Sequence, residues 1–254
     1  MGFIDRIKED YQKVKDKPAK EKWGFFWDYY KIPAICIVLV VSLMVYSVLT
    51  ITNQKEIVFS GVLLNCKIGI DEEDFLDGYY QHAGIDGETQ AAAFYADMML
   101  AKQLGSDKNN NTIQRIIAGV SVQDTDFITG DPYAFQSCAY NTSRLFKDLR
   151  EFLDPETLEK YKDRLYYVDE DIIDQINNRE TNLKTLEYPE DPKKPETMKK
   201  PIPVGIDISD CKAFMDTYYV GSYTDSDPVV YIGVVQNTLR PELAKQFISY
   251  LFAS

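Results

Sequence analysis

The longest apolar run of the chain is the 20-residue stretch 32–51, which contains no charged side chain. At 1.5 Å per helical residue, this run is about as long as the ~30 Å hydrocarbon core of a bilayer. A buried core helix is usually shorter and keeps a polar edge, and a cleavable signal peptide has a shorter apolar region followed by a small-residue cleavage site. The pattern therefore predicts a single transmembrane helix that is retained as an anchor.

Residues 1–31, which precede this run, combine basic and aromatic side chains. Apolar residues recur at helical spacing among Lys and Asp from Phe3 to Val14, and Pro18 ends the pattern. This spacing predicts a short amphipathic helix that either lies on the inner leaflet or binds a cytoplasmic partner. Six aromatic side chains follow, of the kind that gathers at the headgroup level of membranes: Trp23, Phe25, Phe26, Trp27, Tyr29 and Tyr30.

Charge is distributed unevenly about the apolar run. Residues 1–31 carry 8 Lys and Arg side chains, whereas only Lys55 and Lys67 follow the run closely. Because basic flanks stay on the cytoplasmic side, we expect a cytoplasmic amino terminus and an extracellular region 57–253. Beyond residue 31, 20 basic residues stand against 34 acidic ones, which argues against a nucleic-acid partner, since phosphate binding needs a basic face. The lipid bilayer is the partner that this pattern indicates.

Region 57–253 alternates between strand-like and helix-like patterns. Apolar and β-branched runs predict strands at 56–66, 89–100, 125–130, 165–168, 202–209 and 228–237. Helical periodicity and capping residues predict helices at 71–86, 111–122, 132–153, 154–165, 210–219 and 240–252. Strands that alternate with helices are typical of an α/β domain with a mainly parallel sheet.

Residues 174–203 break the alternation. They are polar, hold 5 of the 11 prolines and show no apolar periodicity. We expect a surface excursion there, with 178–200 as the most mobile internal stretch of the domain.

Three cysteines fall in the outer region, at positions 66, 138 and 211. They are predicted to be either small buried side chains or to include one disulfide, such as Cys66 to Cys211. Their spacing suits no zinc site, and the single histidine, His82, has no triad partners. The sequence therefore predicts no metal, no cofactor and no enzymatic activity.

Candidate binding residues come from the ends of the predicted strands. Asp131 follows the strand 125–130 directly and precedes Pro132, a favourable first residue for a helix. In open α/β sheets, ligands gather at the carboxyl ends of strands. We therefore expect Asn65, Asp131, Tyr133 and Asp207 to line one cleft. The alternative is that Asp131 only caps the following helix.

Several short motifs resemble those of extracellular solute-binding proteins with the type II periplasmic-binding fold. They are Ala118 with Gly119, Asp126 at the start of a strand, Asp148 with Leu149, and the terminal set Ala244, Phe247 and Leu251. The match covers roughly residues 57–253. With its aromatic juxtamembrane segment, the chain is also similar to uncharacterised membrane-anchored proteins of anaerobic Gram-positive bacteria.

The resemblance implies a membrane-anchored, solute-binding-like protein with a small extracellular ligand. In that family a second lobe fills much of the stretch where this chain has about 30 polar residues, which implies a reduced, mostly one-lobe domain. Without a second lobe to close over a solute, a non-enzymatic interaction or scaffold module within a membrane complex is the other reading. Its partner would be a membrane protein.

Overall fold

The computed structural model describes residues 3–52, 54–69, 71–140, 144–178, 186–219 and 229–253. The chain divides into two compact units, Met1–Gln54 and Lys55–Ser254.

The first unit consists of two helices, α1 (Phe3–Val14) and α2 (Ala19–Thr52). The predicted apolar run forms part of α2, whose 34 residues extend upstream through the aromatic segment. Most of the described apolar side chains along this helix are exposed, which in a folded protein marks a surface that meets another apolar phase. By length and composition, α2 is able to cross a membrane.

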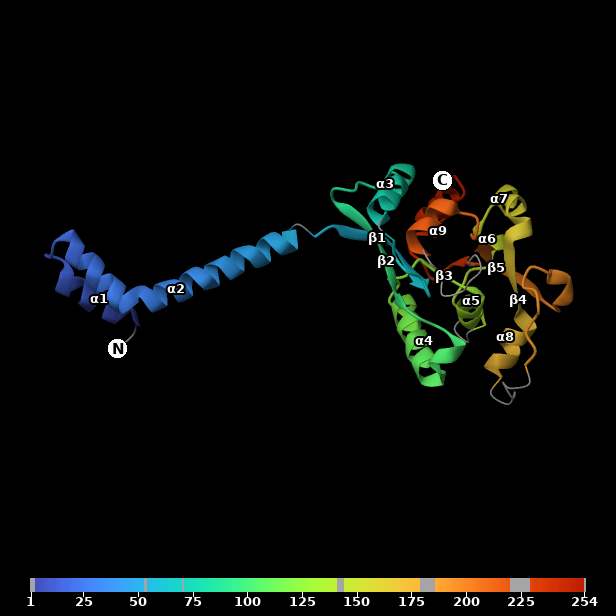
Figure 1. Ribbon diagram of the computed structural model, residues 1–254, viewed down its shortest axis with the longest axis horizontal. Helices are drawn as coiled ribbons and strands as arrows, with labels where there is room; N and C mark the ends of the chain where they lie inside the picture. The colour runs from blue at the N-terminus through green and yellow to red at the C-terminus, as the bar shows by residue number, and fades with distance from the viewer. Residues whose placement is uncertain are drawn as a thin grey trace. The chain divides into compact units, whose positions relative to one another are not determined.

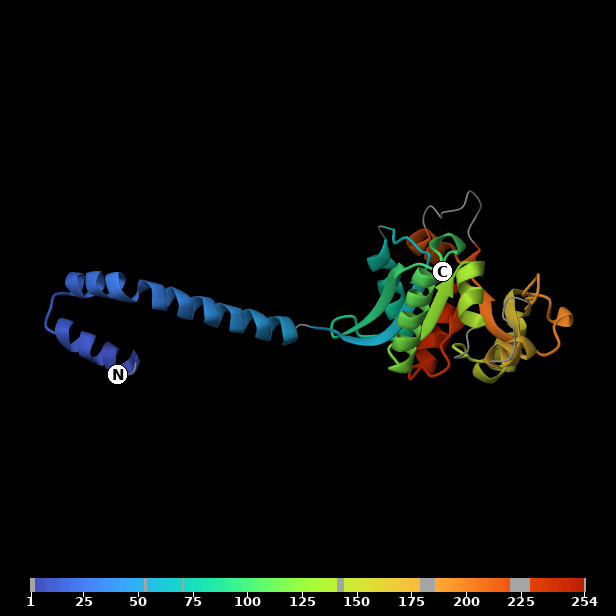
Figure 2. The same ribbon diagram turned by 90° about the horizontal axis from the view of Figure 1, so that it is seen from below.

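Helix α1 turns back alongside the first turns of α2 (Figures 1 and 2). The Tyr30 hydroxyl donates a 2.6 Å hydrogen bond to the Asp10 carboxylate, and the Val14 side chain is buried between the two helices. The predicted amphipathic helix is thus present, and it packs against α2.

The second unit is built on a six-stranded mixed sheet in the order β2-β1-β3-β6-β5-β4. Its strands are β1 (Glu56–Leu64), β2 (Gln90–Met98), β3 (Phe127–Gly130), β4 (Leu165–Asp169), β5 (Pro201–Asp207) and β6 (Tyr231–Val234). All six lie within or overlap the ranges predicted from the sequence.

Strand direction divides the sheet into two halves. β1 pairs in parallel with both β2 and β3, as the α/β pattern predicts. The pairs β3–β6, β6–β5 and β5–β4 are antiparallel, so the prediction of a mainly parallel sheet is wrong for this half. β5 nevertheless runs in the same direction as β1 and β3, because two antiparallel steps separate it from β3.

Helices cover both faces of the sheet (Figure 1). One face packs against α3 (Glu72–Ala83), α6 (Leu149–Phe152), α7 (Pro155–Lys160), α9 (Lys212–Tyr218) and α10 (Pro241–Leu251). The other packs against α4 (Ser106–Ser121), α5 (Pro132–Ala139) and α8 (Glu170–Asn177). Short 3₁₀ turns lie at η1 (Lys102–Leu104), η2 (Lys162–Arg164) and η4 (Pro195–Thr197).

The single helix predicted for 132–153 is wrong. Helix α5 ends at Ala139, and α6 begins only at Leu149, where the Asp148 side chain caps it. Between them Phe146 forms an isolated antiparallel bridge with Val235, the residue directly after β6. A continuous helix would hold Phe135 and Phe146 about 16 Å apart. Instead the two rings stack on one another, with centroids 4.9 Å apart, so the chain turns back between them.

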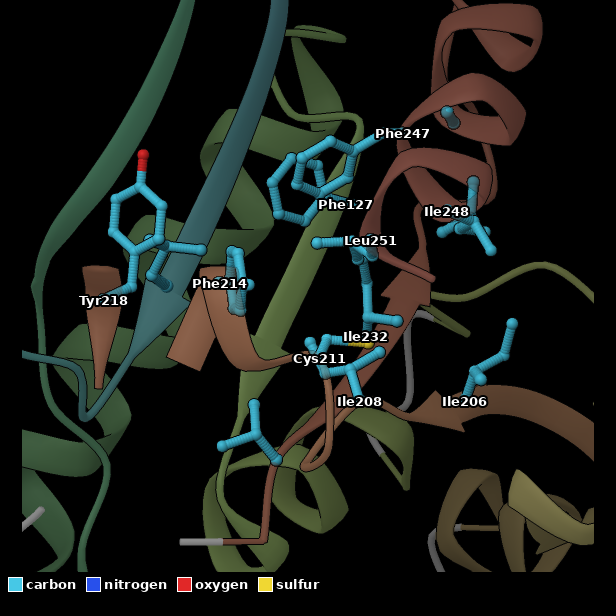
Figure 3. Close-up of a cluster of buried hydrophobic side chains, with 14 of the residues drawn as sticks. Phe127, Ile206, Ile208, Cys211, Phe214, Tyr218, Ile232, Phe247, Ile248 and Leu251 are labelled. Atoms are coloured by element: carbon cyan, nitrogen blue, oxygen red, sulfur yellow. The ribbon is translucent and has the colours of Figure 1, made fainter. Parts of the chain in front are cut away.

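A cluster of aromatic rings fills the core beneath α3, α9 and α10 (Figure 3). Phe247 of α10 lies against Phe127 of β3, with ring centroids 4.7 Å apart. Gly61 of β1 is the register partner of Phe127, and a Cβ at this position would stand 2.1 Å from the Phe127 ring. The glycine therefore makes room for the ring that joins the sheet to α10.

The polar excursion is partly ordered secondary structure. Its ends fall in α8, which runs to Asn177, and in β5, which begins at Pro201. The 186–200 segment lies along the edge strand β4, where the Tyr167 backbone N–H donates a 2.8 Å hydrogen bond to the Pro192 carbonyl. Met198 is buried, and the Asp169 carboxylate accepts hydrogen bonds from the backbone of 199 and 200. This segment therefore covers the edge of the sheet, while 179–185 falls outside the described residues.

The three outer cysteines are buried free thiols, so the disulfide alternative is not realised. We expect them to be inert in the folded protein. Burial raises the pKa of each thiol, of Cys66, Cys138 and Cys211, to about 12, and the thiolate is the reactive form.

In a Cys36→Ser background, which removes the anchor thiol, an aromatic disulfide reagent at pH 8 should label none of the three until urea unfolds the domain. Because the folded pKa values are raised, the stability that the neutral thiols contribute is complete below their ordinary pKa. It should be lost as pH rises toward 12. Rapid labelling of a single native thiol would contradict the buried assignment.

Candidate functional site

Three of the four predicted site residues lie at the same edge of the sheet. Asn65 follows β1, Asp131 follows β3, and Asp207 ends β5, and these strands run in the same direction. The three positions thus face the carboxyl-terminal edge, where α/β folds commonly hold ligands.

Asn65 and Asp131 are in direct contact. The Asn65 side-chain NH₂ donates a 2.7 Å hydrogen bond to an Asp131 carboxylate oxygen and a 2.6 Å hydrogen bond to the Leu100 carbonyl. The Asn65 side-chain oxygen accepts a hydrogen bond from the Leu100 N–H. Asn65 has φ of 57°, the left-handed region that asparagine tolerates better than most residues. This asparagine therefore ties the ends of β1 and β3 to the segment after β2.

Asp131 is the N-cap of α5. Its second carboxylate oxygen accepts a 2.9 Å hydrogen bond from the Ala134 N–H, and Pro132 occupies the first helical position. One oxygen thus caps the helix, as the capping alternative states, and the other is engaged by Asn65. Tyr133 belongs to the same helix, and its hydroxyl accepts a long, 3.4 Å hydrogen bond from Asn109.

Asp207 belongs to a separate group of side chains. Its carboxylate forms a 2.5 Å ion pair with Lys193 and accepts hydrogen bonds from the Ser209 N–H and hydroxyl. Within the described part of the chain, no hydrogen bond or ion pair joins Asp207 to Asn65, Asp131 or Tyr133. The structure therefore brings two of the four predicted residues into contact and leaves Asp207 in its own cluster.

Two buried hydroxyls at this edge were missed by the sequence analysis. The Tyr219 hydroxyl donates a 3.1 Å hydrogen bond to the Leu64 carbonyl and lies 3.0 Å from the Thr129 hydroxyl. Burial raises the pKa of Tyr219, so the phenol stays neutral. The one signal in the sequence was a hydroxyl residue inside the otherwise apolar strand that ends at Gly130.

A cleft of about 220 Å³ lies elsewhere, over the β4–β5 half of the sheet. Its apolar floor includes Val168 and its register partner Ile202, near the start of β5 and so toward the edge opposite to Asp207. Arg144 lines it and forms ion pairs with Glu170 at 3.1 Å and Asp174 at 3.0 Å. Arg144 has φ of 44°, a strained value for arginine.

The polar groups at the carboxyl-terminal edge therefore act on one another. Asn65 and Asp131 use their side-chain atoms in hydrogen bonds within the fold, and Asp207 is neutralised by Lys193. A side chain that is already satisfied within the protein has to break those bonds before it binds a ligand. Chemically, this edge is equipped to hold strand ends together.

Replacing Asp131 tests whether its carboxylate is needed beyond capping. Asp131→Asn keeps an oxygen for the Ala134 N–H but places an amide against the Asn65 amide, which is held in place by Leu100. We expect Asn to cost about 1 kcal/mol of unfolding free energy and Ala about 2 kcal/mol. Urea denaturation followed by far-ultraviolet circular dichroism measures both.

The matched control is Asp154→Asn. Asp154 caps α7 through the Thr157 N–H, but its second oxygen meets the Thr157 hydroxyl, which is able to rotate. This substitution should be nearly neutral. Equal effects of Asn at both positions would show that the Asn65 contact contributes nothing.

Lys193→Met is expected to lower stability by about 1 kcal/mol at pH 7, and by less at pH 3. Burial raises the pKa of Asp207, but hydrogen bonds from Lys193 and Ser209 outweigh it and hold the pKa below its usual range. Because the pKa of Asp207 is lower in the folded state, its carboxylate stabilises the fold at pH values above the unfolded-state pKa, about 3.9. This contribution is lost as pH falls through the folded-state pKa.

Urea midpoints of wild type and variant at the two pH values provide the measurement. Lys200→Met serves as the control, because Lys200 stands 3.8 Å from Asp174 and both side chains are more than half exposed. A difference between wild type and Lys193→Met that does not change with pH would rule out the ion pair as its source.

Comparisons with known proteins found no relative of this chain: no family model, curated protein or solved structure matches it.

Proposed function

We propose that the chain is a single-pass membrane protein whose Lys55–Ser254 domain lies outside the cell and serves as a non-enzymatic interaction module of a membrane complex. The domain would be a reduced, one-lobe form of the periplasmic-binding-like fold. The observation that carries the proposal is the internal saturation of Asn65 and Asp131 at the strand ends. A fold that uses these groups for its own stability serves better as a scaffold than as a clamp.

Exposed apolar side chains supply a surface for such a partner. Val122 and Leu239 are the most exposed large apolar side chains among the domain's described residues, at 66% and 65%. The loops that carry them are joined by hydrogen bonds from the Asn237 amide to the Val120 carbonyl and from Gln123 to the Asn237 carbonyl. Two exposed apolar side chains on hydrogen-bonded, adjoining loops suit an apolar surface of a neighbouring membrane protein.

The orientation rests on the basic flank of residues 1–31, since cytoplasmic segments next to a span are rich in Lys and Arg. Protease added to intact cells should digest the chain beyond Ile51 and spare an amino-terminal tag. Protection of the carboxyl terminus would reverse the orientation.

A second candidate function is the binding of a small solute, and the cleft beside Arg144 favours it. The cleft combines apolar walls with acidic groups, including Glu151 and Glu170, and has a volume of about 220 Å³. This is below the ~300 Å³ at which ligand pockets usually begin, so only a small solute with apolar and charged parts would fit.

One pair of measurements separates the two functions. In mild detergent, the full chain should migrate in a complex larger than itself, and Val122→Asp with Leu239→Asp should release it. Met99→Asp, an exposed apolar position at the end of β2, is the matched control and should leave the complex intact. If the size never exceeds that of the chain while amino acids, sugars or amines raise its melting temperature, solute binding replaces the interaction function.

A further inference from the structure

The two helices of the Met1–Gln54 unit enclose a groove of about 540 Å³. On the α1 side, Tyr11 and Val14 line it, and on the α2 side it runs from Lys22 to Val38. Pro33 and Ala34 form part of the α2 wall, and their small side chains leave the space between the helices unfilled.

The groove spans the level at which a membrane changes from polar to apolar. Its Lys22 end lies within the aromatic segment, whose rings are of the type that settles among lipid headgroups. Its other end, beside Ile37 and Val38, lies inside the uncharged run. An occupant must therefore have a polar end and an apolar end, in that order along α2.

Charge at the polar end specifies the occupant further. Residues 13–22 hold 5 lysines against 2 acidic side chains, and Lys15, Lys20 and Lys22 are exposed there. Basic residues beside a membrane helix attract anionic lipid headgroups. The wall beyond them is almost entirely apolar, with Phe25, Phe26 and Ile37 among its members.

We propose that the α1–α2 groove is a binding site for one anionic phospholipid of the inner leaflet, with its phosphate beside the lysines and an acyl chain along Ala34 and Ile37. The inference rests on α2 crossing the bilayer, which is part of the proposed function. The Asp10–Tyr30 hydrogen bond holds α1 in place as the second wall of the site.

The tryptophans allow a direct test. Trp23 and Trp27 are the only two in the chain, and the Trp23 ring packs edge-on against Phe26 of the groove wall, with centroids 5.7 Å apart. The full chain is reconstituted into nanodiscs of phosphatidylcholine with a minority of phosphatidylglycerol, and bromine, which quenches tryptophan, is placed on the acyl chains of one lipid or the other. The two disc preparations contain the same mole fraction of brominated lipid. Compared with brominated phosphatidylcholine, brominated phosphatidylglycerol should quench as though it were enriched about fivefold around the tryptophans.

Ala34→Phe fills the groove and should reduce this preference to parity. Cys36→Phe adds a similar ring at the same depth on the opposite side of α2, about 200° away, and should keep the preference. Cys36 is exposed and does not line the groove.

Three results would overturn the inference. Equal quenching by both lipids in the wild type would show no site, and a preference that survives Ala34→Phe would trace to diffuse attraction by the lysines. Quenching by neither lipid would show that α2 is outside the bilayer, in which case the membrane-anchored function fails as well.

Discussion

Asp126→Ala should lower the free energy of unfolding of the Lys55–Ser254 domain by about 3–5 kcal/mol, because it breaks a buried ion pair and leaves its partners unsatisfied. Asp126 is fully buried at the start of β3. One carboxylate oxygen accepts 2.8 Å hydrogen bonds from the Ser60 N–H and from Arg240, and the other accepts from the Thr238 hydroxyl at 2.5 Å. The carboxylate thus joins β1, β3 and the entry to α10.

An exposed pair of the same chemistry is the control. Arg115 and Asp97 stand 2.9 Å apart, close to the 2.8 Å of the buried pair, but both side chains are more than half exposed. Asp97→Ala should therefore cost less than about 1 kcal/mol. Urea unfolding should be followed by far-ultraviolet circular dichroism, since both tryptophans lie outside this domain. A loss below 1 kcal/mol for Asp126→Ala would mean that water replaces the carboxylate.

Much of the fold was predictable because burial leaves a periodic trace in the sequence. The motif Ala244, Phe247 and Leu251 is the buried face of α10, which the helical spacing indicates directly. Strand direction leaves no such trace: β6 and β5 have apolar patterns like those of parallel strands, yet both take part in antiparallel pairs. Only contacts distant in the sequence decide direction.

The sequence predicted where the candidate site residues lie, but not that their polar groups are already hydrogen-bonded within the fold. The rule for strand ends places Asn65, Asp131 and Asp207 at one edge, and the capping alternative for Asp131 is what the hydrogen bonds show. Besides Asp131, Asn65 bonds to the backbone of Leu100, and Asp207 pairs with Lys193 in the polar excursion. Neither partner has a local sequence signal, so composition alone gave no indication that these polar groups are already satisfied.

Composition predicted only part of what the structure shows for the polar excursion. High Pro and Lys content predicts a mobile surface segment, and its mobility stays a prediction. The contacts had no such signal: the 186–200 part covers the edge strand β4, and Met198 is buried. Such covering prevents edge strands from pairing with other chains. β2, at the opposite end of the sheet, is the other edge strand.

Phe247→Ala should cost about 3–5 kcal/mol of unfolding free energy, the range typical of removing a fully buried aromatic ring. Phe247 has no exposed surface and connects α10 to three strands, through rings whose centroids lie 4.7–5.5 Å away: Phe127, Phe94 and Phe59. Because Gly61 and the strands fix these rings from below, the neighbouring side chains have little freedom to move into the cavity.

The control is Phe252→Ala, at the end of the same helix. Its ring is only partly buried and packs chiefly on Tyr161, with centroids 4.6 Å apart, so we expect a loss of about 1 kcal/mol. Phe247→Leu, which keeps most of the buried volume, should fall between the two. If Phe247→Ala shifts the urea midpoint no further than Phe252→Ala, with the same dependence on urea concentration, then α10 is held to the sheet by other contacts, of which the Asp126–Arg240 pair is the strongest candidate.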